Sequence, residues 1–180
     1  MFLKFPKLFV LMYLFVGLTA CSSGGDESGG VPGDFYFQIS VDGAPVQRIN
    51  IDVSGPEYDI MAWYNTATDK TTVLALLEWN AIDELYDKVF EFSFSGMGTG
   101  SQTVTLAEYW LNDGSNTNYK HIPFTQSSAT LNITEYGQLA QPIVGEFDFK
   151  LCLDTAACDT NFKTVTGSFT LLRQPDRTEP

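Results

Sequence analysis

The stretch VFEFSFSG, residues 89–96, places a phenylalanine at every second position. Successive side chains of an extended chain point to opposite faces, so Phe90, Phe92 and Phe94 share one face, and the other face is mostly polar. Such alternation, closed by a glycine, is typical of a β-strand with one buried face. We therefore predict a strand here, within a sheet that buries an aromatic core.

The same alternation recurs along most of the chain after residue 33. In FYFQISVD, residues 35–42, aromatic and aliphatic side chains fall on one face, and Asp42-Gly43 supplies a tight turn. Further strands are expected at residues 46–53, 57–64, 102–111, 119–124, 129–136, 143–153 and 162–172. The pattern is that of many short strands joined by turns.

Two stretches differ from this pattern. Residues 71–79, TTVLALLEW, are apolar on both faces, which predicts a central strand covered on both sides. Residues 81–88, AIDELYDK, favour one or two helical turns, with Ile82, Leu85 and Tyr86 facing inward. With no helix of ordinary length, the chain is expected to be all-β. We predict an antiparallel β-sandwich of about nine or ten strands, with a lipocalin-like β-barrel as the alternative.

The N-terminus has the organisation of an export leader. Lys4 and Lys7 precede an apolar core at residues 8–18, and small residues follow. Because a membrane-spanning helix needs about 20 apolar residues, this core favours a cleaved secretory signal peptide over residues 1–20. An uncleaved signal anchor and an ordinary secreted protein are the alternatives.

The tetrapeptide LTAC, residues 18–21, resembles the lipobox of bacterial lipoproteins. That resemblance implies diacylglycerol on the Cys21 thiol, cleavage after Ala20 and acylation, for example with palmitate, of the new amine. Ser22 stands where enterobacterial lipoproteins retained in the inner membrane carry Asp, so by analogy we expect the outer membrane. The protein would then bind a membrane through its lipid anchor, on the periplasmic face or at the cell surface.

The remaining chain divides into three parts. Residues 21–33 comprise the lipidated cysteine and a flexible tether rich in glycine and serine, which cannot bury enough apolar area to fold. Residues 34–175 form the predicted β-sandwich domain, and residues 176–180 a loose tail. Loss of the two leader lysines leaves eight basic residues against 22 acidic ones, a net charge near −14. Such acidity argues against nucleic acid as a partner.

Four motifs lie where strands are expected: FQISVDG (37–43), LNITEYG (131–137), VGEFDF (144–149) and VTGSFTLLR (165–173). Together with the leader, they resemble small lipoproteins common in Bacteroidota and other Gram-negative bacteria. The resemblance implies an all-β, lipid-anchored domain and supplies no catalytic residue. The motifs are structural, because Gly145 and Gly167 each precede an inward-facing phenylalanine, Phe147 and Phe169.

Cys152 and Cys158 are the thiols that remain once Cys21 is acylated. They bracket LDTAA, where one strand should turn back into the next, and exported proteins meet an oxidising compartment. We predict a disulfide that pins this hairpin. A zinc site is disfavoured, since no second Cys or His pair lies nearby.

Few residues suggest enzymatic chemistry. His121 is the single histidine, and no nucleophile motif accompanies it, so a Ser-His-Asp or Cys-His site is not expected. A carboxylate pair for glycoside hydrolysis stays open, because the spatial separation of acids is not visible in a sequence. We expect no enzyme activity and no cofactor.

Two polar loops offer oxygen ligands of the kind that calcium prefers. The first contains Asp113 with Asn112, Asn116 and Asn118, and the second contains Asp154, Asp159 and Asn161. Neither has EF-hand spacing, so ordinary turns are the favoured interpretation and no metal site is predicted.

The candidate ligand-binding residues are aromatic side chains near expected strand ends: Trp63, Tyr64, Tyr109 and Trp110. Rings beside loops with Asn and Gln can stack on sugars or hold a peptide, although such rings also belong to sheet cores and rims. The leading hypothesis is a non-enzymatic binding module for a glycan or for an envelope or extracellular protein. The alternatives are a structural or assembly accessory without a ligand, and an inhibitor of a cationic host enzyme such as lysozyme.

Overall fold

The computed structural model describes residues 34–53, 59–82, 85–112, 117–121, 127–153 and 158–178, and each regular element in these ranges is a β-strand. The strands are β1 (Tyr36–Val41), β2 (Gln47–Asn50), β3 (Ile60–Asn65), β4 (Lys70–Asn80), β5 (Leu85–Ser95), β6 (Gly100–Gln102), β7 (Val104–Leu111), β8 (Thr117–Lys120), β9 (Ser128–Tyr136), β10 (Pro142–Cys152) and β11 (Phe162–Leu172). All their pairings are antiparallel. The predicted all-β class is confirmed.

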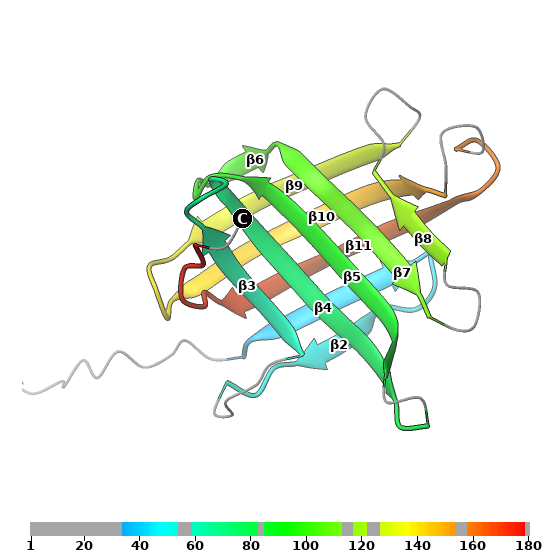
Figure 1. Cartoon of the computed structure of the whole chain (residues 1–180), viewed down its shortest axis with the longest axis horizontal. Helices are drawn as coiled ribbons and strands as arrows, with labels where there is room; N and C mark the ends of the chain where they lie inside the picture. Colours follow the sequence, from blue (N-terminus) through cyan, green and yellow to red (C-terminus); the bar gives the residue numbers. More distant parts are fainter. Residues whose placement is uncertain are drawn as a thin grey trace, which may run out of the picture. The chain divides into compact units, whose positions relative to one another are not determined.

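The strands form one hydrogen-bonded sheet that folds over into two layers, whose strands cross one another in Figure 1. The first layer has the order β6–β9–β10–β11–β1–β2, and the second has the order β3–β4–β5–β7–β8. The chain changes layer at Thr103, between β6 and β7, and the layers also join where Cys152 pairs with Lys120. Because β2 and β3 do not pair with each other, the described sheet stays open, as in a sandwich rather than a closed barrel.

The C-terminal segment that the sequence assigns to a loose tail is ordered as far as the described chain extends. Gln174 N donates to Ala62 O, and Arg177 N donates to Tyr64 O, both over 2.8 Å. The segment thus runs beside the free edge of β3 and satisfies its backbone groups. This pairing could not be predicted from the composition of the segment, because the partner strand β3 lies more than a hundred residues away in the sequence.

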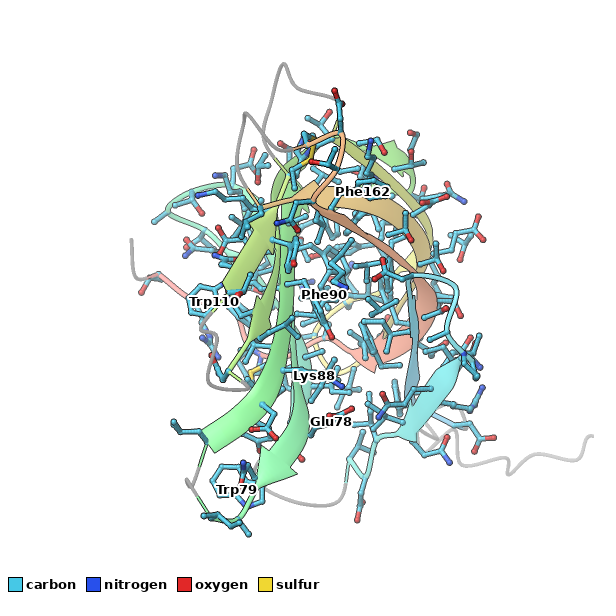
Figure 2. The ribbon with its side chains drawn as sticks, turned by 90° about the vertical axis from the view of Figure 1, so that its right-hand side faces the viewer. Glu78, Trp79, Lys88, Phe90, Trp110 and Phe162 are labelled. Carbon is cyan, nitrogen blue, oxygen red and sulfur yellow. A yellow bond between two sulfur atoms is a disulfide. The ribbon has the colours of Figure 1, made fainter. Side chains whose placement is uncertain are left out.

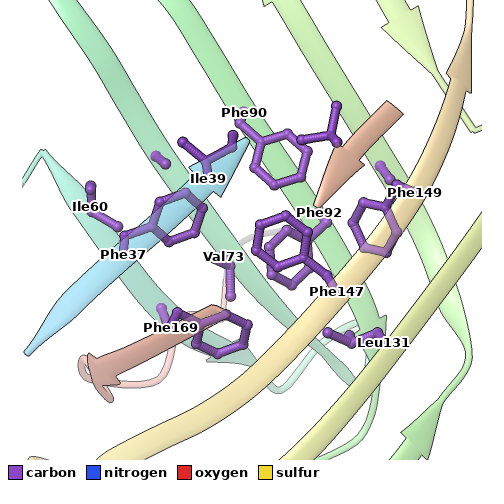
Figure 3. Close-up of a cluster of buried hydrophobic side chains, with 14 of the residues drawn as sticks. Phe37, Ile39, Ile60, Val73, Phe90, Phe92, Leu131, Phe147, Phe149 and Phe169 are labelled. Atoms are coloured by element: carbon purple, nitrogen blue, oxygen red, sulfur yellow. The ribbon is translucent and has the colours of Figure 1, made fainter. Parts of the chain in front are cut away.

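The core is a cluster of phenylalanine rings contributed by both layers (Figure 3). Phe90 and Phe92 project inward from β5, as the alternation at residues 89–96 predicts, and both are fully buried. Phe147 of β10 meets them at ring-centroid distances of 5.2 and 5.5 Å. Tilted and edge contacts at this spacing suit the quadrupoles of aromatic rings.

The two glycines of the G-x-F motifs have a specific packing role. In the register of β10 and β11, Gly145 lies opposite Phe169 and Gly167 lies opposite Phe147. Each phenylalanine ring therefore covers the glycine on the neighbouring strand, and a Cβ atom at Gly167 would approach Phe147 Cζ to 2.5 Å. This reciprocal arrangement requires glycine at both positions.

The disulfide between Cys152 and Cys158 is present, as predicted. The helical turns expected at residues 81–88 are not, because Leu85 and Tyr86 begin β5 and Ile82 is exposed rather than inward. The apolar residues there have the spacing of a helix because the stretch runs from a hairpin turn into a strand, and not because they share one helical face.

Candidate functional site

The outer faces of the two layers differ in chemistry. Alternate residues of the first layer point away from the core and are polar; they include Thr130, Asn132, Glu146, Asp148, Thr164, Thr166, Ser168 and Thr170. On the second layer Thr72, Glu91, Ser93 and Glu108 also point outward, but beside them lies a set of apolar residues: Met61, Trp63, Leu74, Leu76, Val89, Leu106 and Trp110. We call this second set the apolar face.

The apolar face corrects the interpretation of residues 71–79. These residues lie in β4, where Val73, Ala75 and Leu77 are buried in the core, as expected for the inner side. Leu74 and Leu76, however, are only partly buried, because no further layer of the described chain covers them. A strand that is apolar on both faces here indicates a surface available for binding rather than a strand covered on both sides.

Trp110 is the most exposed side chain of this face, with 43 % of its surface accessible. It points away from the core, on the opposite side of the layer from Phe90 (Figure 2). Its indole Nε1 donates to Glu108 Oε2 over 2.8 Å, two residues earlier on the same strand face. Asn118 Nδ2 donates to the same carboxylate oxygen over 3.2 Å, so Glu108 fixes the ring against β8.

A cavity of about 330 Å³ lies beside this indole, lined by Trp110, Asn112, Thr117 and Asn118. Asn112 Nδ2 donates a hydrogen bond to Tyr86 O, and the side-chain oxygen of Asn112 takes no part in this contact. Asn118 Oδ1 is buried and accepts no hydrogen bond from the described residues. The cavity thus combines one exposed aromatic ring with amide and hydroxyl groups.

The electrostatics of the face centre on two carboxylates. Glu91 and Glu108 lie directly opposite each other on β5 and β7. Partial burial raises the pKa of Glu91, and the neighbouring Glu108 charge raises it further. Like charges in direct cross-strand register destabilise a sheet. Folding alone does not favour this pair.

The structure separates the four aromatic residues singled out from the sequence. Trp63 lies on the apolar face, on β3, and the Arg177 guanidinium stacks 3.9 Å from the centre of its ring system. Tyr64 donates through its hydroxyl to Asp69 Oδ1 over 2.7 Å, and this hydrogen bond raises the pKa of the phenol. Tyr109 is buried, with its ring against Phe90, so it belongs to the core and not to a ligand surface.

Of the four, Trp110 alone lines a described cavity. Sequence reasoning missed Glu108 and Thr117 as partners, and it considered Asn118 only as a calcium ligand. One signal was available, since Glu108 and Trp110 are two residues apart and therefore share a strand face. The contribution of β8 comes from the hairpin that it forms with β7, in which Asn118 lies opposite Trp110; strand alternation alone does not give this register.

A second cavity, of about 310 Å³, lies on the polar outer face of the first layer. Asn132, Glu146 and Asp148 contribute to its lining, and its one aromatic residue, Phe147, is buried in the core. Without an exposed ring it offers hydrogen bonds but no stacking surface, so the cavity at Trp110 is the stronger candidate.

The other residues considered from the sequence are His121, the two polar loops and Cys21. His121 Nδ1 lies 2.9 Å from Ser127 Oγ, and burial lowers the pKa of the imidazole. Within the described ranges, His121 has no carboxylate partner, and no three His, Cys, Asp or Glu side chains gather as a metal site. Asp113 and Asp154, from the two loops considered for calcium, lie outside the described residues, as does Cys21.

Fold and site together define a two-layered antiparallel β-sandwich in which one outer face is polar and the other mixes apolar with polar side chains and carries an exposed indole. Comparison with protein-family models, with curated proteins and with solved structures finds no match to this chain. The described residues include no helix with the length and apolar character needed to cross a bilayer.

Proposed function

We propose that this chain is a lipid-anchored outer-membrane lipoprotein whose β-sandwich is a non-enzymatic binding module for a glycan. The observation that carries the binding proposal is the exposed Trp110 indole, fixed by Glu108 beside a cavity lined with amide and hydroxyl groups. Indole rings present a broad apolar surface with a polar edge, which suits the apolar face of a pyranose ring. The amides of Asn112 and Asn118 supply donors and acceptors for its hydroxyls.

The rigidity of the site supports this proposal. A ligand loses affinity when it must immobilise the side chains that contact it. Here the Glu108 carboxylate already holds the Trp110 and Asn118 side chains through hydrogen bonds of 2.8 and 3.2 Å. A sugar would therefore meet an ordered platform.

Replacement of Trp110 by alanine is expected to weaken binding of the preferred glycan at least about tenfold, or about 1.4 kcal/mol, because the stacking surface is lost. A glycan array with the wild-type domain would select the ligand, and isothermal titration calorimetry would measure both affinities. Trp79→Ala is the matched control, since Trp79 is also an exposed tryptophan but lies outside this cavity.

Equal loss of affinity in the two variants would contradict the assignment of the site to Trp110. Absence of glycan binding by the wild-type domain would instead favour a protein ligand. That second candidate has its own support, because Met61, Leu74, Leu76 and Val89 extend the apolar face beyond the cavity. An envelope or extracellular protein would cover these side chains, as in an assembly accessory or an inhibitor.

The lipid anchor is tested separately from the binding site. Cells that express the wild type should incorporate radioactive palmitate into the protein, and cells that express Cys21→Ala should not, because the thiol and the new amine at residue 21 are the acylation points. The wild type should also sediment with outer membranes. Equal labelling of both proteins would exclude Cys21 as the modified residue.

A further inference from the structure

The end of the β4–β5 hairpin projects beyond the rest of the sandwich. Pairing of β3 with β4 ends at Ile60 and Ala75, and pairing of β5 with β7 ends at Lys88 and Leu111. From Glu78 to Leu85 the two hairpin strands therefore pair only with each other among the described residues, and Asn112 next to β7 donates to Tyr86 O and Asp87 O at the base. Figures 1 and 2 show this end extending away from the layers.

Three large apolar side chains are exposed at this end. Trp79 is 55 % exposed, Ile82 is 91 % exposed and Leu85 is 59 % exposed. Trp79 pairs with Tyr86 and Leu85 pairs with Asn80, so the indole and the leucine lie on opposite faces of the hairpin end, and Ile82 lies in its turn. The end of the hairpin therefore exposes apolar side chains on both faces and at its tip, which is more than the single exposed residues that are ordinary on a surface. We call Trp79, Ile82 and Leu85 the hairpin patch.

The hairpin patch is held in place by its surroundings. The Trp79 ring meets Tyr86 edge-on at 5.0 Å, and the Tyr86 hydroxyl donates to Asp59 Oδ1. At the base, Lys88 Nζ and Glu78 Oε1 form an ion pair of 2.6 Å. Such bracing means that little conformational entropy remains to be lost when a partner binds.

The backbone at the base adds a second observation. Glu78 has a φ of +56°, in the left-handed region that side chains other than glycine, asparagine and aspartate rarely adopt. Strained residues of this kind cluster at functional sites. Here the strained residue lies immediately before Trp79, where it sets the direction of the indole.

Charge around the hairpin patch restricts its partner. Asp59, Glu78 and Asp87 surround it, and its one nearby cation, Lys88, is paired with Glu78. This charge disfavours a second copy of the chain, and it disfavours insertion into lipid, where carboxylates would lose their hydration.

We propose that the hairpin patch docks into an apolar pocket, rimmed by Lys or Arg side chains, on a partner protein. Trp79 is the anchor, because buried tryptophans dominate the affinity of such interfaces. The acidic rim matches the basic rim of the pocket and sets orientation and association rate. This interaction uses residues outside the Trp110 cavity and stands independently of glycan binding.

The test places the photo-crosslinker p-benzoylphenylalanine at residue 82 of the full-length protein in its source cells. A discrete adduct with one protein is expected on irradiation, and it should be lost when Leu85→Ser is added. Leu139 is the control position, since it is an exposed leucine in a different turn. A crosslinker at residue 139 should give no such adduct.

The protein in the adduct is then identified, purified and titrated with the wild-type domain. Trp79→Ala should weaken its affinity about tenfold or more while Trp110→Ala leaves it unchanged. Raising salt from about 0.1 M to about 1 M should also weaken binding, because it shortens the Debye length from about 10 Å to about 3 Å. Circular dichroism of each variant checks that the fold is kept.

Several results would overturn the proposal. They are the absence of any adduct from residue 82, an adduct with lipid or with a second copy of the chain, equal adducts from both positions, and binding that neither Trp79→Ala nor salt weakens. Loss of glycan binding with this docking retained would overturn only the proposed function.

Discussion

Replacing Phe147 by alanine is expected to lower the free energy of unfolding by about 4 kcal/mol. The ring lies at the centre of the aromatic core, with the centroids of five other phenylalanine rings, from residues 37, 90, 92, 149 and 169, within 6.4 Å. Truncation removes the transfer free energy of the ring and leaves a cavity that neighbours from two layers cannot fill. It also removes the cover over Gly167. Urea denaturation followed by circular dichroism measures the change.

Phe162→Ala is the control for this variant. Phe162 is 37 % exposed and contacts Lys150 Nζ 4.4 Å from its ring centre, so its loss should cost about 1 kcal/mol or less. Similar losses for the two variants would mean that the core does not depend on Phe147 as the ring distances indicate.

Much of the core could be predicted from local patterns. Alternation placed Phe37, Phe90 and Phe147 on buried faces, and the G-x-F motifs identified β10 and β11 together with the glycines that their rings cover. These features are local because strand periodicity is two, whatever the partner strand. The disulfide could be predicted in the same way, because Cys152 and Cys158 lie on either side of an expected turn.

The other features of the fold and of the site could not be predicted without knowing which strands pair and in what register. The pairing of Arg177 with β3 joins segments more than a hundred residues apart, so the tail was expected to be loose. The two faces of β4 looked alike in sequence, and only the layer order shows that Leu74 and Leu76 lack cover. The site depends on the register of one hairpin rather than on a distant pairing, because Asn118 lies opposite Trp110 in the pairing of β7 with β8.

The candidate site and the hairpin patch share a physical property: both depart from what stability alone would favour. Glu91 faces Glu108 across two strands and is partly desolvated, which raises its pKa. Trp79 and Trp110 expose large apolar surfaces to water. Natural proteins tolerate such costs where a ligand or partner offsets them. The outer face of the first layer departs less, since its outward side chains in β10 and β11 from Glu146 to Ser168 are polar except for Phe162.

Replacing Gly167 by alanine is expected to cost about 3 kcal/mol, the upper end of the usual range for overpacking. A Cβ atom there would lie 2.0 Å from Gln38 O on β1 and 2.5 Å from Phe147 Cζ on β10, so neighbours on both sides must move. Gly98→Ala is the control, because its Cβ would meet only Gln102 Nε2 at 3.8 Å; a change within about 0.5 kcal/mol is expected.

The two clashes at Gly167 can be separated by a double mutant. Phe147→Leu shortens the ring that covers the glycine but leaves the Gln38 carbonyl in place, so it should relieve only part of the cost of Gly167→Ala. A double-mutant cycle measured by urea denaturation gives that part as the coupling energy between residues 147 and 167. No coupling would assign the whole cost to the β1 backbone. Full rescue would show that β1 yields and that glycine is required there by the ring alone.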